Sequence, residues 1–234
     1  MSVFTPIGIL LFGSLIVAFS GLTSGIFLIL YHSLLGRMSR RRASDFAMFF
    51  IFGVETTLTL LLLSVYTIFN VSLGFINFYN SNIFTWILTG LLVFFGILYG
   101  TIYFRPSRGT KLFISRPIAH RYHVKADAVK SRSDAFMLGL SALLPDLLFT
   151  TPILIISVLT VAHLGSTPPA RAGLLIIFVL ISILPLLLLH LCFNSGRNLA
   201  DLLRFRFKNK AFFRFLVTLF YFLVALLIIL RNIL

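Results

Sequence analysis

Residues 135–161 read AFMLGLSALLPDLLFTTPILIISVLTV, an apolar segment that holds a single charged side chain, Asp146. The segment exceeds the ~20 residues that an α-helix needs to cross the ~30 Å hydrocarbon core of a bilayer. The whole chain is similarly apolar, since 59% of its 234 residues are hydrophobic, 11% are charged and the mean hydropathy is +1.05. This composition predicts a protein embedded in lipid, where an interior charge is costly and usually functional.

Six apolar segments are long enough to cross a membrane. Helices are expected, because backbone polar groups in lipid must hydrogen-bond within the chain. The first segment has no basic residue before it and is too long for the apolar region of a signal peptide, so it should remain as a helix. The predicted fold class is all-α, a polytopic membrane protein whose six transmembrane helices are Ile7–Tyr31, Phe46–Ile68, Phe84–Phe104, Ala135–Val161, Gly173–Leu191 and Phe215–Leu230.

The basic residues indicate the orientation of these helices. Eighteen of the twenty Lys and Arg residues lie in segments 32–45, 105–134 and 192–214, which leaves Arg171 and Arg231 for the other side. The positive-inside rule places the three basic segments in the cytoplasm and both termini outside, in a membrane that is expected to be the bacterial cytoplasmic membrane. The net charge of +14 is therefore assigned to topology and to an anionic cytoplasmic leaflet, and no nucleic-acid partner is expected.

An odd number of helices in each half would give the two halves opposite orientations. The chain forms one membrane domain, with a first three-helix half at 1–104, a basic cytoplasmic loop at 105–134 and a second three-helix half at 135–234. We therefore expect two inverted three-helix halves, an arrangement found in many secondary transporters. A homodimer is left open.

Two acids stand in the middle of predicted helices. Glu55 and Asp146 lie about 13 and 16 Å from the cytoplasmic ends of their segments at 1.5 Å per residue, near the midplane in both cases. Asp146 shares a helical face with Thr150, and Glu55 shares one with Thr59. Burial and a second carboxylate nearby both disfavour the charged form of a carboxyl group, so in a shared site one or both groups are expected to be protonated at neutral pH, which suits a proton-coupled carrier. The alternative is a structural hydrogen bond to a Thr or Ser of a neighbouring helix.

Three prolines are predicted to break helices and free backbone carbonyls. Pro145 frees the carbonyl of Ser141, while Pro152 and Pro185 free those of Leu148 and Ile181. Such carbonyls can coordinate a cation or a substrate ammonium where the backbone lines a cavity, although a plain kink is equally expected. The candidate substrate and ion site comprises Glu55, Asp146, Thr59, Thr150 and Ser141.

No enzymatic motif accompanies these residues. His120 and His123 lack the further ligands of a metal site and are assigned to a solvated basic loop, so neither a metal nor a cofactor is expected. Cys192 is the only cysteine, which excludes an internal disulfide. A transporter is favoured over an enzyme. A lipid-active enzyme that uses Asp146 as its base would lack a partner motif.

The chain resembles the superfamily that joins LysE-type exporters to the membrane domain of cytochrome c biogenesis and DsbD-type thiol reductant carriers. The resemblance rests on the six-span plan and on three stretches: Gly90–Leu98, Phe136–Leu140 leading to Pro145 and Pro152, and Gly173–Leu175. In the reductant carriers a Pro-Cys pair breaks two helices, and here Pro145 is followed by Asp146. The resemblance therefore implies a shared fold without the redox cysteines.

Two functions follow. The first is a secondary transporter, an exporter of a small solute that uses Glu55 and Asp146 to bind protons or cations. The second is a redox-inactive relative of the reductant carriers that acts as a scaffold or partner subunit, in which the acids are structural.

The charge distribution yields a testable topology. A reporter fused after Leu234 should give a signal typical of the outside of the membrane, and fusions within 105–134 should give a cytoplasmic one. A cytoplasmic signal from the fusion after Leu234 would require an odd number of spans or the opposite orientation.

Overall fold

The protein is helical throughout the residues that the structure, a computed structural model, describes: 4–19, 22–71, 82–103, 116–164, 167–195, 201 and 208–233. Its long elements are α1 (Phe4–Phe19), α2 (Leu22–Leu35), α3 (Arg40–Val71), α5 (Asn82–Leu98), α6 (Arg116–Ala128), α7 (Arg132–Ala142), α8 (Leu147–Leu164), α9 (Pro168–Asn194) and α11 (Lys210–Ile233). Two short turns complete them, the π-helical η1 (Tyr99–Tyr103) and the 3₁₀-helical η2 (Leu144–Asp146).

The six predicted transmembrane helices are confirmed as apolar helical segments of sufficient length. Within the described residues these segments are Thr5–Leu35, Arg40–Phe69, Ile83–Thr101, Arg132–Leu164, Pro168–Asn194 and Ala211–Arg231. Most of them extend beyond the predicted bounds, because the basic and polar residues at their ends continue the helices. The chain is therefore compatible with an integral membrane protein.

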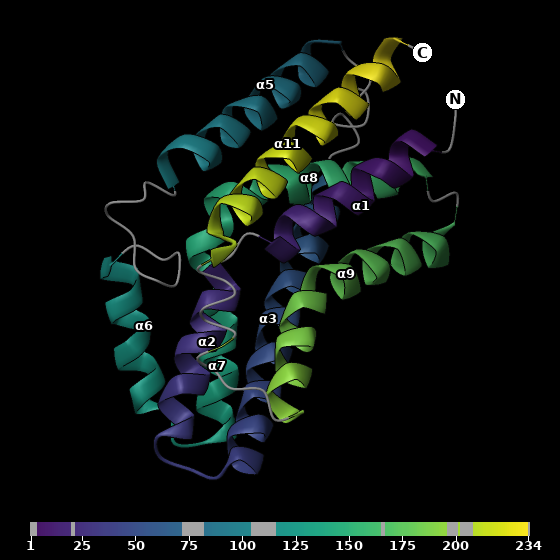
Figure 1. Ribbon diagram of the computed structural model, residues 1–234. Coiled ribbons are helices and arrows are strands. Elements are labelled where there is room, and N and C mark those ends of the chain that lie inside the picture. Colours follow the sequence, from purple (N-terminus) through teal and green to yellow (C-terminus); the bar gives the residue numbers. More distant parts are fainter. Residues whose placement is uncertain are drawn as a thin grey trace.

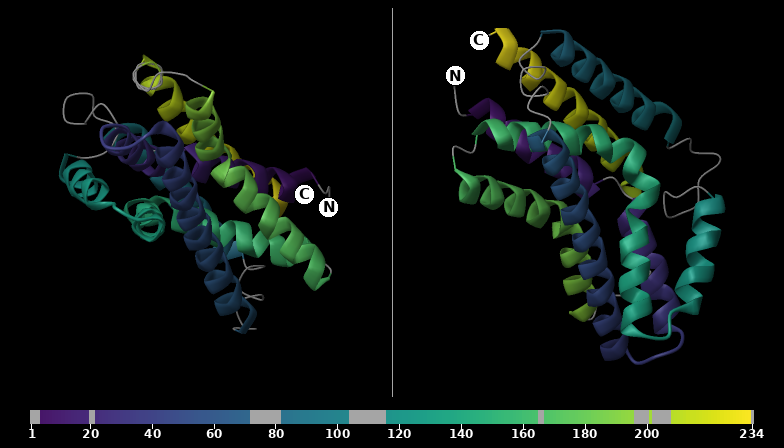
Figure 2. Two further views of the ribbon diagram at one scale, coloured as in Figure 1. Left: turned by 90° about the horizontal axis from the view of Figure 1, so that it is seen from below. Right: turned by 180° about the vertical axis from the view of Figure 1, so that it is seen from behind.

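The helices form two groups that are inclined to each other (Figures 1 and 2). In one group α2, α3 and α7 run side by side, with α6 outside α2 and the C-terminal part of α9 alongside α3. In the other, α1, α5, α8 and α11 lie together. The groups meet where α1 gives way to α2 and where α7 gives way to α8, and α9 changes direction within its length (Figure 1).

Helix α7 begins and ends for identifiable reasons. Ser131 caps its start, because its hydroxyl accepts from the Asp134 N–H at 3.1 Å while the Asp134 carboxylate accepts from the Ser131 N–H at 2.9 Å. At its end, Pro145 cannot donate to the carbonyl of Ser141, and the chain passes through η2 before α8 resumes at Leu147. Pro152 and Pro185, by contrast, lie inside α8 and α9.

The first transmembrane segment is divided as well, which the sequence analysis did not anticipate. Helix α1 ends at Phe19 and α2 begins at Leu22 with a different direction (Figure 1). This segment has no proline between its two helices, so the sequence contained no strong helix-breaking residue from which the change in direction could be predicted.

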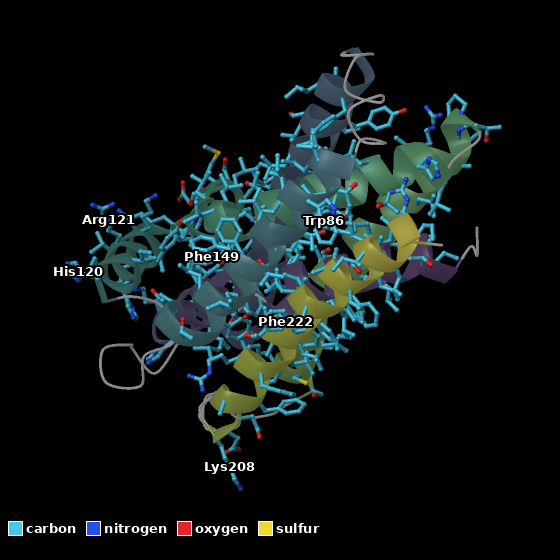
Figure 3. The ribbon with its side chains drawn as sticks, turned by 90° about the horizontal axis from the view of Figure 1, so that it is seen from above. Trp86, His120, Arg121, Phe149, Lys208 and Phe222 are labelled. Atoms are coloured by element: carbon cyan, nitrogen blue, oxygen red, sulfur yellow. The ribbon has the colours of Figure 1, made fainter. Side chains whose placement is uncertain are left out.

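A second difference concerns the basic stretch 105–134. Residues 116–128 of this predicted solvated loop form α6, which packs on α2. Its buried side chains, Tyr122, Ala126 and Val129 just beyond its end, recur at spacings of four and three, so a narrow apolar face was hidden among basic residues. His120 and Arg121 project from α6 away from the bundle (Figure 3).

The closest helix contact joins α3 and α7 through two glycines. A Cβ on Gly139 would lie 3.1 Å from the Cα of Gly53 and would collide with the carbonyl oxygen of Phe50. A Cβ on Gly53 would lie 2.9 Å from the backbone nitrogen of Leu140 and would collide with the carbonyl oxygen of Phe136. Small residues permit such close approach in membranes, where dispersion and hydrogen bonds hold helices together.

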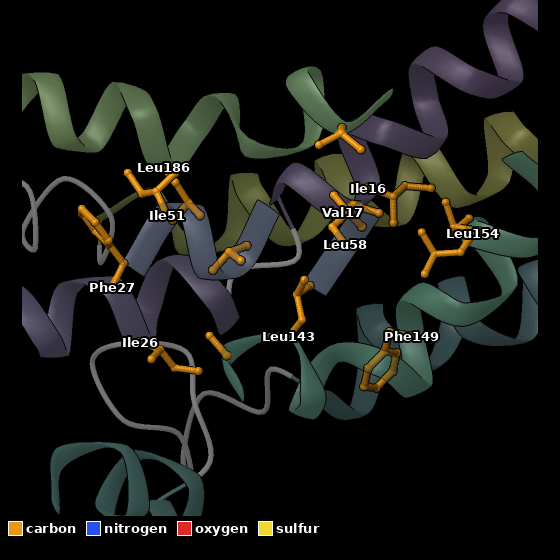
Figure 4. Close-up of a cluster of buried hydrophobic side chains, with 14 of the residues drawn as sticks. Ile16, Val17, Ile26, Phe27, Ile51, Leu58, Leu143, Phe149, Leu154 and Leu186 are labelled. Atoms are coloured by element: carbon orange, nitrogen blue, oxygen red, sulfur yellow. The ribbon is translucent and has the colours of Figure 1, made fainter. Parts of the chain in front are cut away.

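The core collects side chains from both helix groups. Figure 4 shows part of it, with labelled residues such as Ile16 of α1, Phe27 of α2, Leu58 of α3 and Leu154 of α8, each at most 2% exposed. Tyr31 of α2 stacks on Phe193 of α9 with ring centroids 4.0 Å apart. Large apolar side chains such as Trp86 and Phe222 (Figure 3) are exposed instead, as expected where helices face lipid.

The glycine contact is testable by adding one methyl group. Gly139→Ala and Gly53→Ala should destabilise the protein by about 1–3 kcal/mol or more, because the added Cβ meets backbone that cannot rotate away. The measurement is the thermal midpoint and folded yield in detergent.

Matched controls exist in other helices. Gly90 of α5 and Gly173 of α9 have nothing within 4 Å of an added Cβ, so Gly90→Ala and Gly173→Ala should be neutral or slightly stabilising. A Gly139→Ala protein that melts with these controls would contradict the close contact.

Candidate functional site

Asp146 lies at the junction of the two helix groups. It is the last residue of η2, and its side chain is buried, with a relative exposure of 0%. Its N–H donates to the Leu143 carbonyl at 2.9 Å, and its carbonyl accepts from the Thr150 hydroxyl at 3.0 Å. These bonds fix the backbone on both sides of the residue, so the helix break holds the carboxyl group in the protein interior and away from lipid.

Tyr122 of α6 reaches the same junction. Its hydroxyl donates to the Ser141 carbonyl at 2.5 Å, which is the carbonyl that Pro145 cannot pair with. Burial raises the pKa of Tyr122, the hydrogen bond to Ser141 opposes this rise, and the nearby charge of Asp146 adds to it. Tyr122 therefore both satisfies the interrupted backbone and lies within electrostatic range of Asp146.

A polar cluster at the end of α2 and in the turn that follows it holds α6 in place. The Ser33 hydroxyl donates to Asp127 Oδ1 at 2.7 Å, and Arg37 Nη2 lies 2.5 Å from the same oxygen. Arg37 also donates to the Asp127 carbonyl. The hydrogen bond from Ser33, together with the charge of Arg37, lowers the pKa of Asp127. Because the cluster is exposed, its main effect is to fix the position of α6 rather than to add much stability.

A second tyrosine supports α8 from the opposite side. Tyr221 of α11, 1% exposed, donates its hydroxyl to the Phe149 carbonyl at 2.7 Å and lies within electrostatic range of Asp146. Two tyrosines from different helices thus serve backbone carbonyls on either side of η2. Sequence reasoning missed both. A tyrosine inside an otherwise apolar helix, such as Tyr221, is a signal for such a hydrogen bond, whereas Tyr122 lies in a basic segment without that signal.

The hydroxyls of Ser141 and Thr150 bond within their own segments. Ser141 Oγ donates to the Leu138 carbonyl at 2.9 Å, and Thr150 Oγ1 donates to the Asp146 carbonyl. Each oxygen keeps lone pairs that can accept a hydrogen bond or ligate a cation. Thr150 follows Asp146 by one helical turn and Ser141 precedes the helix break, so both hydroxyls belong to the segments that flank Asp146.

Glu55 lies in a different environment. It is partly buried and lines a pocket of about 450 Å³ between α3 and α9. Thr59 lines the same pocket, while Tyr66 and Arg171 line it near the end of α3 and the start of α9. The other lining residues are Leu62, Leu63, Pro168, Ala172, Leu175, Ile176, Val179 and Leu180.

The described pocket brings Glu55 and Thr59 together but does not include Asp146, Ser141 or Thr150. The glycine contact accounts for the direction of Glu55. Gly53 faces α7, and Glu55, two residues further along α3, points roughly 200° around the helix axis. Glu55 is thereby directed to α9, whereas Asp146 lies among α7, α8 and the tyrosines of α6 and α11.

A hydrogen-bonded group joins α3 and α9 at the end of the bundle where α3 begins. Ser44 donates to Asn194 Oδ1 at 2.7 Å, and Asn194 Nδ2 lies 3.2 Å from His190 Nε2. His190 is a buried residue of α9. The described part of the chain contains no group of three His, Cys, Asp or Glu side chains that could hold a metal ion.

The docking of α6 can be tested at Asp127. Asp127→Asn removes the charge that attracts Arg37, so backbone hydrogen exchange in residues 116–128 should accelerate by about two- to fivefold, the modest effect of an exposed ion pair, measured by mass spectrometry. The control is Asp45→Asn, because Asp45 pairs with Arg132 at 3.4 Å outside α6 and should leave that exchange unchanged.

The pH dependence has a defined sign. Because the pKa of Asp127 is lowered on folding from an ordinary value of 3.8, its contribution is complete above that value and is lost as the pH falls through the lowered pKa. Exchange in α6 that is already fast at neutral pH, or insensitive to Asp127→Asn, would contradict this docking.

No protein-family model, curated protein or solved structure matches this chain. The resemblance to the LysE and DsbD-type superfamily therefore remains a hypothesis. The function is inferred from the chemistry of the two carboxylates and from the helices that hold them.

Proposed function

We propose that the protein is a secondary transporter that exports a small solute across a bacterial cytoplasmic membrane, coupled to protons or cations at Asp146 and Glu55. The observation that carries the proposal is the complete burial of Asp146 at a helix break in the middle of an apolar helical segment. An acid at membrane depth is expensive, and such residues usually mark ion or proton pathways.

The divided helices support the proposal. Transporters commonly place substrate and ion sites at discontinuous helices, where interrupted backbone lines the site. In this chain α1 and α2 divide one apolar segment, α7 and α8 divide another, and α2 contacts η2. The two divided segments are the first and fourth, which would be equivalent in two inverted three-helix halves related to those of the LysE and DsbD-type superfamily.

Coupling follows from the electrostatics of Asp146. In its neutral form the carboxyl group is tolerated in the interior, whereas the carboxylate needs a nearby cation or hydrogen-bond donors. Loading or losing a proton or cation would therefore change the relative stability of conformations that bury the group and conformations that expose it. The oxygens of Ser141 and Thr150 would supply further ligands for a cation. On the side that faces α6, the Tyr122 hydroxyl bonds the Ser141 carbonyl.

Bends between the helix groups would permit such a change. Hinges are usually a few residues at element ends that absorb a change in backbone dihedral angles. The junction of α7 with α8, the bend of α9 and the change from α1 to α2 are the positions at which the two groups could tilt (Figure 1).

The test uses purified protein in liposomes that contain a pH-sensitive dye. Gradients of sodium, potassium and a panel of amines and amino acids are imposed in turn, and the dye reports coupled proton movement. Asp146→Asn keeps the shape of the side chain and removes the titratable proton, so it should reduce coupled flux at least tenfold while leaving insertion and the thermal midpoint nearly unchanged. Glu55→Gln should act likewise.

The control is Asp45→Asn, an exposed acid outside both sites. Flux at the parental rate in Asp146→Asn would contradict the role of Asp146. A parent protein that moves no protons or cations under any of these gradients would contradict transport itself.

A further inference from the structure

The pocket between α3 and α9 has a buried floor and an exposed rim. Leu62 and Val179 form part of the floor and are 1% and 6% exposed. Leu63, Ile176 and Leu180 form part of the rim and are 47%, 59% and 51% exposed. With these helices placed across a bilayer, the exposed apolar side chains of the rim would face lipid, so the pocket would open sideways to the hydrocarbon region.

Glu55 is the only acidic residue among the residues that line this pocket. Thr59 lies one helical turn further along α3 on the same face, and most of the remaining lining is aliphatic. A volume of about 450 Å³ is in the range of pockets that hold drug-sized ligands, in which a few polar groups fix the orientation. A carboxylate in apolar surroundings favours a ligand that combines a positive charge with an apolar body.

The opposite end of the pocket carries a positive charge. Arg171 Nη1 of α9 lies 3.3 Å from the Tyr66 hydroxyl of α3, so this pair joins the two helices there. Tyr66 is three turns beyond Glu55, about 16 Å along the helix at 1.5 Å per residue. The guanidinium disfavours a cation at that end, which leaves Glu55 as its counter-ion and the lipid-facing rim as its route of entry.

We propose that the α3–α9 pocket binds a lipophilic organic cation, with its charge at Glu55 and its apolar body along Leu62, Leu175 and Val179. This rests on the proposed function in one respect, since it identifies the class of solute that the transporter would carry. Binding at the pocket is an equilibrium property that does not require flux.

The experiment measures binding of radiolabelled tetraphenylphosphonium to the full-length protein purified in a neutral detergent. We expect saturable binding with about one site per chain. Glu55→Gln should weaken binding at least tenfold, because the amide retains the shape of the side chain and loses its charge. Asp45→Asn removes an acid outside the pocket and should bind as the parent does.

A second variant protects the test against misfolding at Glu55. Ala172 is an exposed lining residue, so Ala172→Trp should fill the pocket and weaken binding at least tenfold without disturbing the core. Parental binding in both Glu55→Gln and Ala172→Trp, or no saturable binding by the parent, would overturn the proposal.

Two outcomes separate this inference from neighbouring ones. Saturable, Glu55-dependent binding in a protein without coupled flux would support the pocket and contradict transport. Coupled flux of another solute in a protein that does not bind the probe would support transport and contradict the cation pocket. Phospholipid that copurifies with the parent and is lost in Arg171→Gln, together with probe binding unaffected by Glu55→Gln, would show that the pocket holds lipid and would overturn the cation proposal.

Discussion

The contact between Gly53 and Gly139 is the constraint on which the remaining structure depends. With no side chain between them, α3 and α7 approach until backbone meets backbone, and the Thr57 hydroxyl donates to the Leu140 carbonyl at 3.0 Å across the contact. This fixes the rotation of both helices. One consequence is that Glu55 faces α9, and another is that the end of α7 places Asp146 inside the bundle. A single close approach thus determines where each acid lies.

The helix break at Pro145 leaves a backbone carbonyl without its usual donor, and another part of the chain supplies one. In lipid there is no water to pair with freed carbonyls, so an interruption is tolerated only where protein supplies donors. Here Tyr122 supplies a donor to the Ser141 carbonyl, and Tyr221 hydrogen-bonds the Phe149 carbonyl further along, in α8. Helix α6 contributes Tyr122 and is held on α2 by Asp127, so a segment outside the membrane spans completes the hydrogen bonding of one inside.

The features that a lipid environment requires were predictable from the sequence, and those that depend on how the helices pack against one another were not. Six spans were predictable because apolar length and internal hydrogen bonding leave no other solution. The interruption at Pro145 was predictable because proline lacks an N–H. The first segment divides between Phe19 and Leu22 without a proline, so its division was not predictable in the same way. The direction of Glu55 depended on which face of α3 packs against α7, and the sequence of α3 alone does not determine that packing. Helix α6 was not predicted, because its few buried residues, such as Tyr122 and Ala126, lie within a basic stretch.

The separation of the two acids changes the form that coupling could take. Two carboxylates in one site would couple by direct repulsion, whereas acids held at different helix contacts can also influence each other through elements that move together. Helices α3 and α7 are such elements, because a backbone contact without intervening side chains offers no soft layer that could slide. Under the proposed function, a cation at Glu55 and a proton or cation at Asp146 would both act on this rigid pair, and the motion between conformations would fall on the bends at η2 and within α9. The glycine contact would then transmit the coupling as well as fix the positions of the acids.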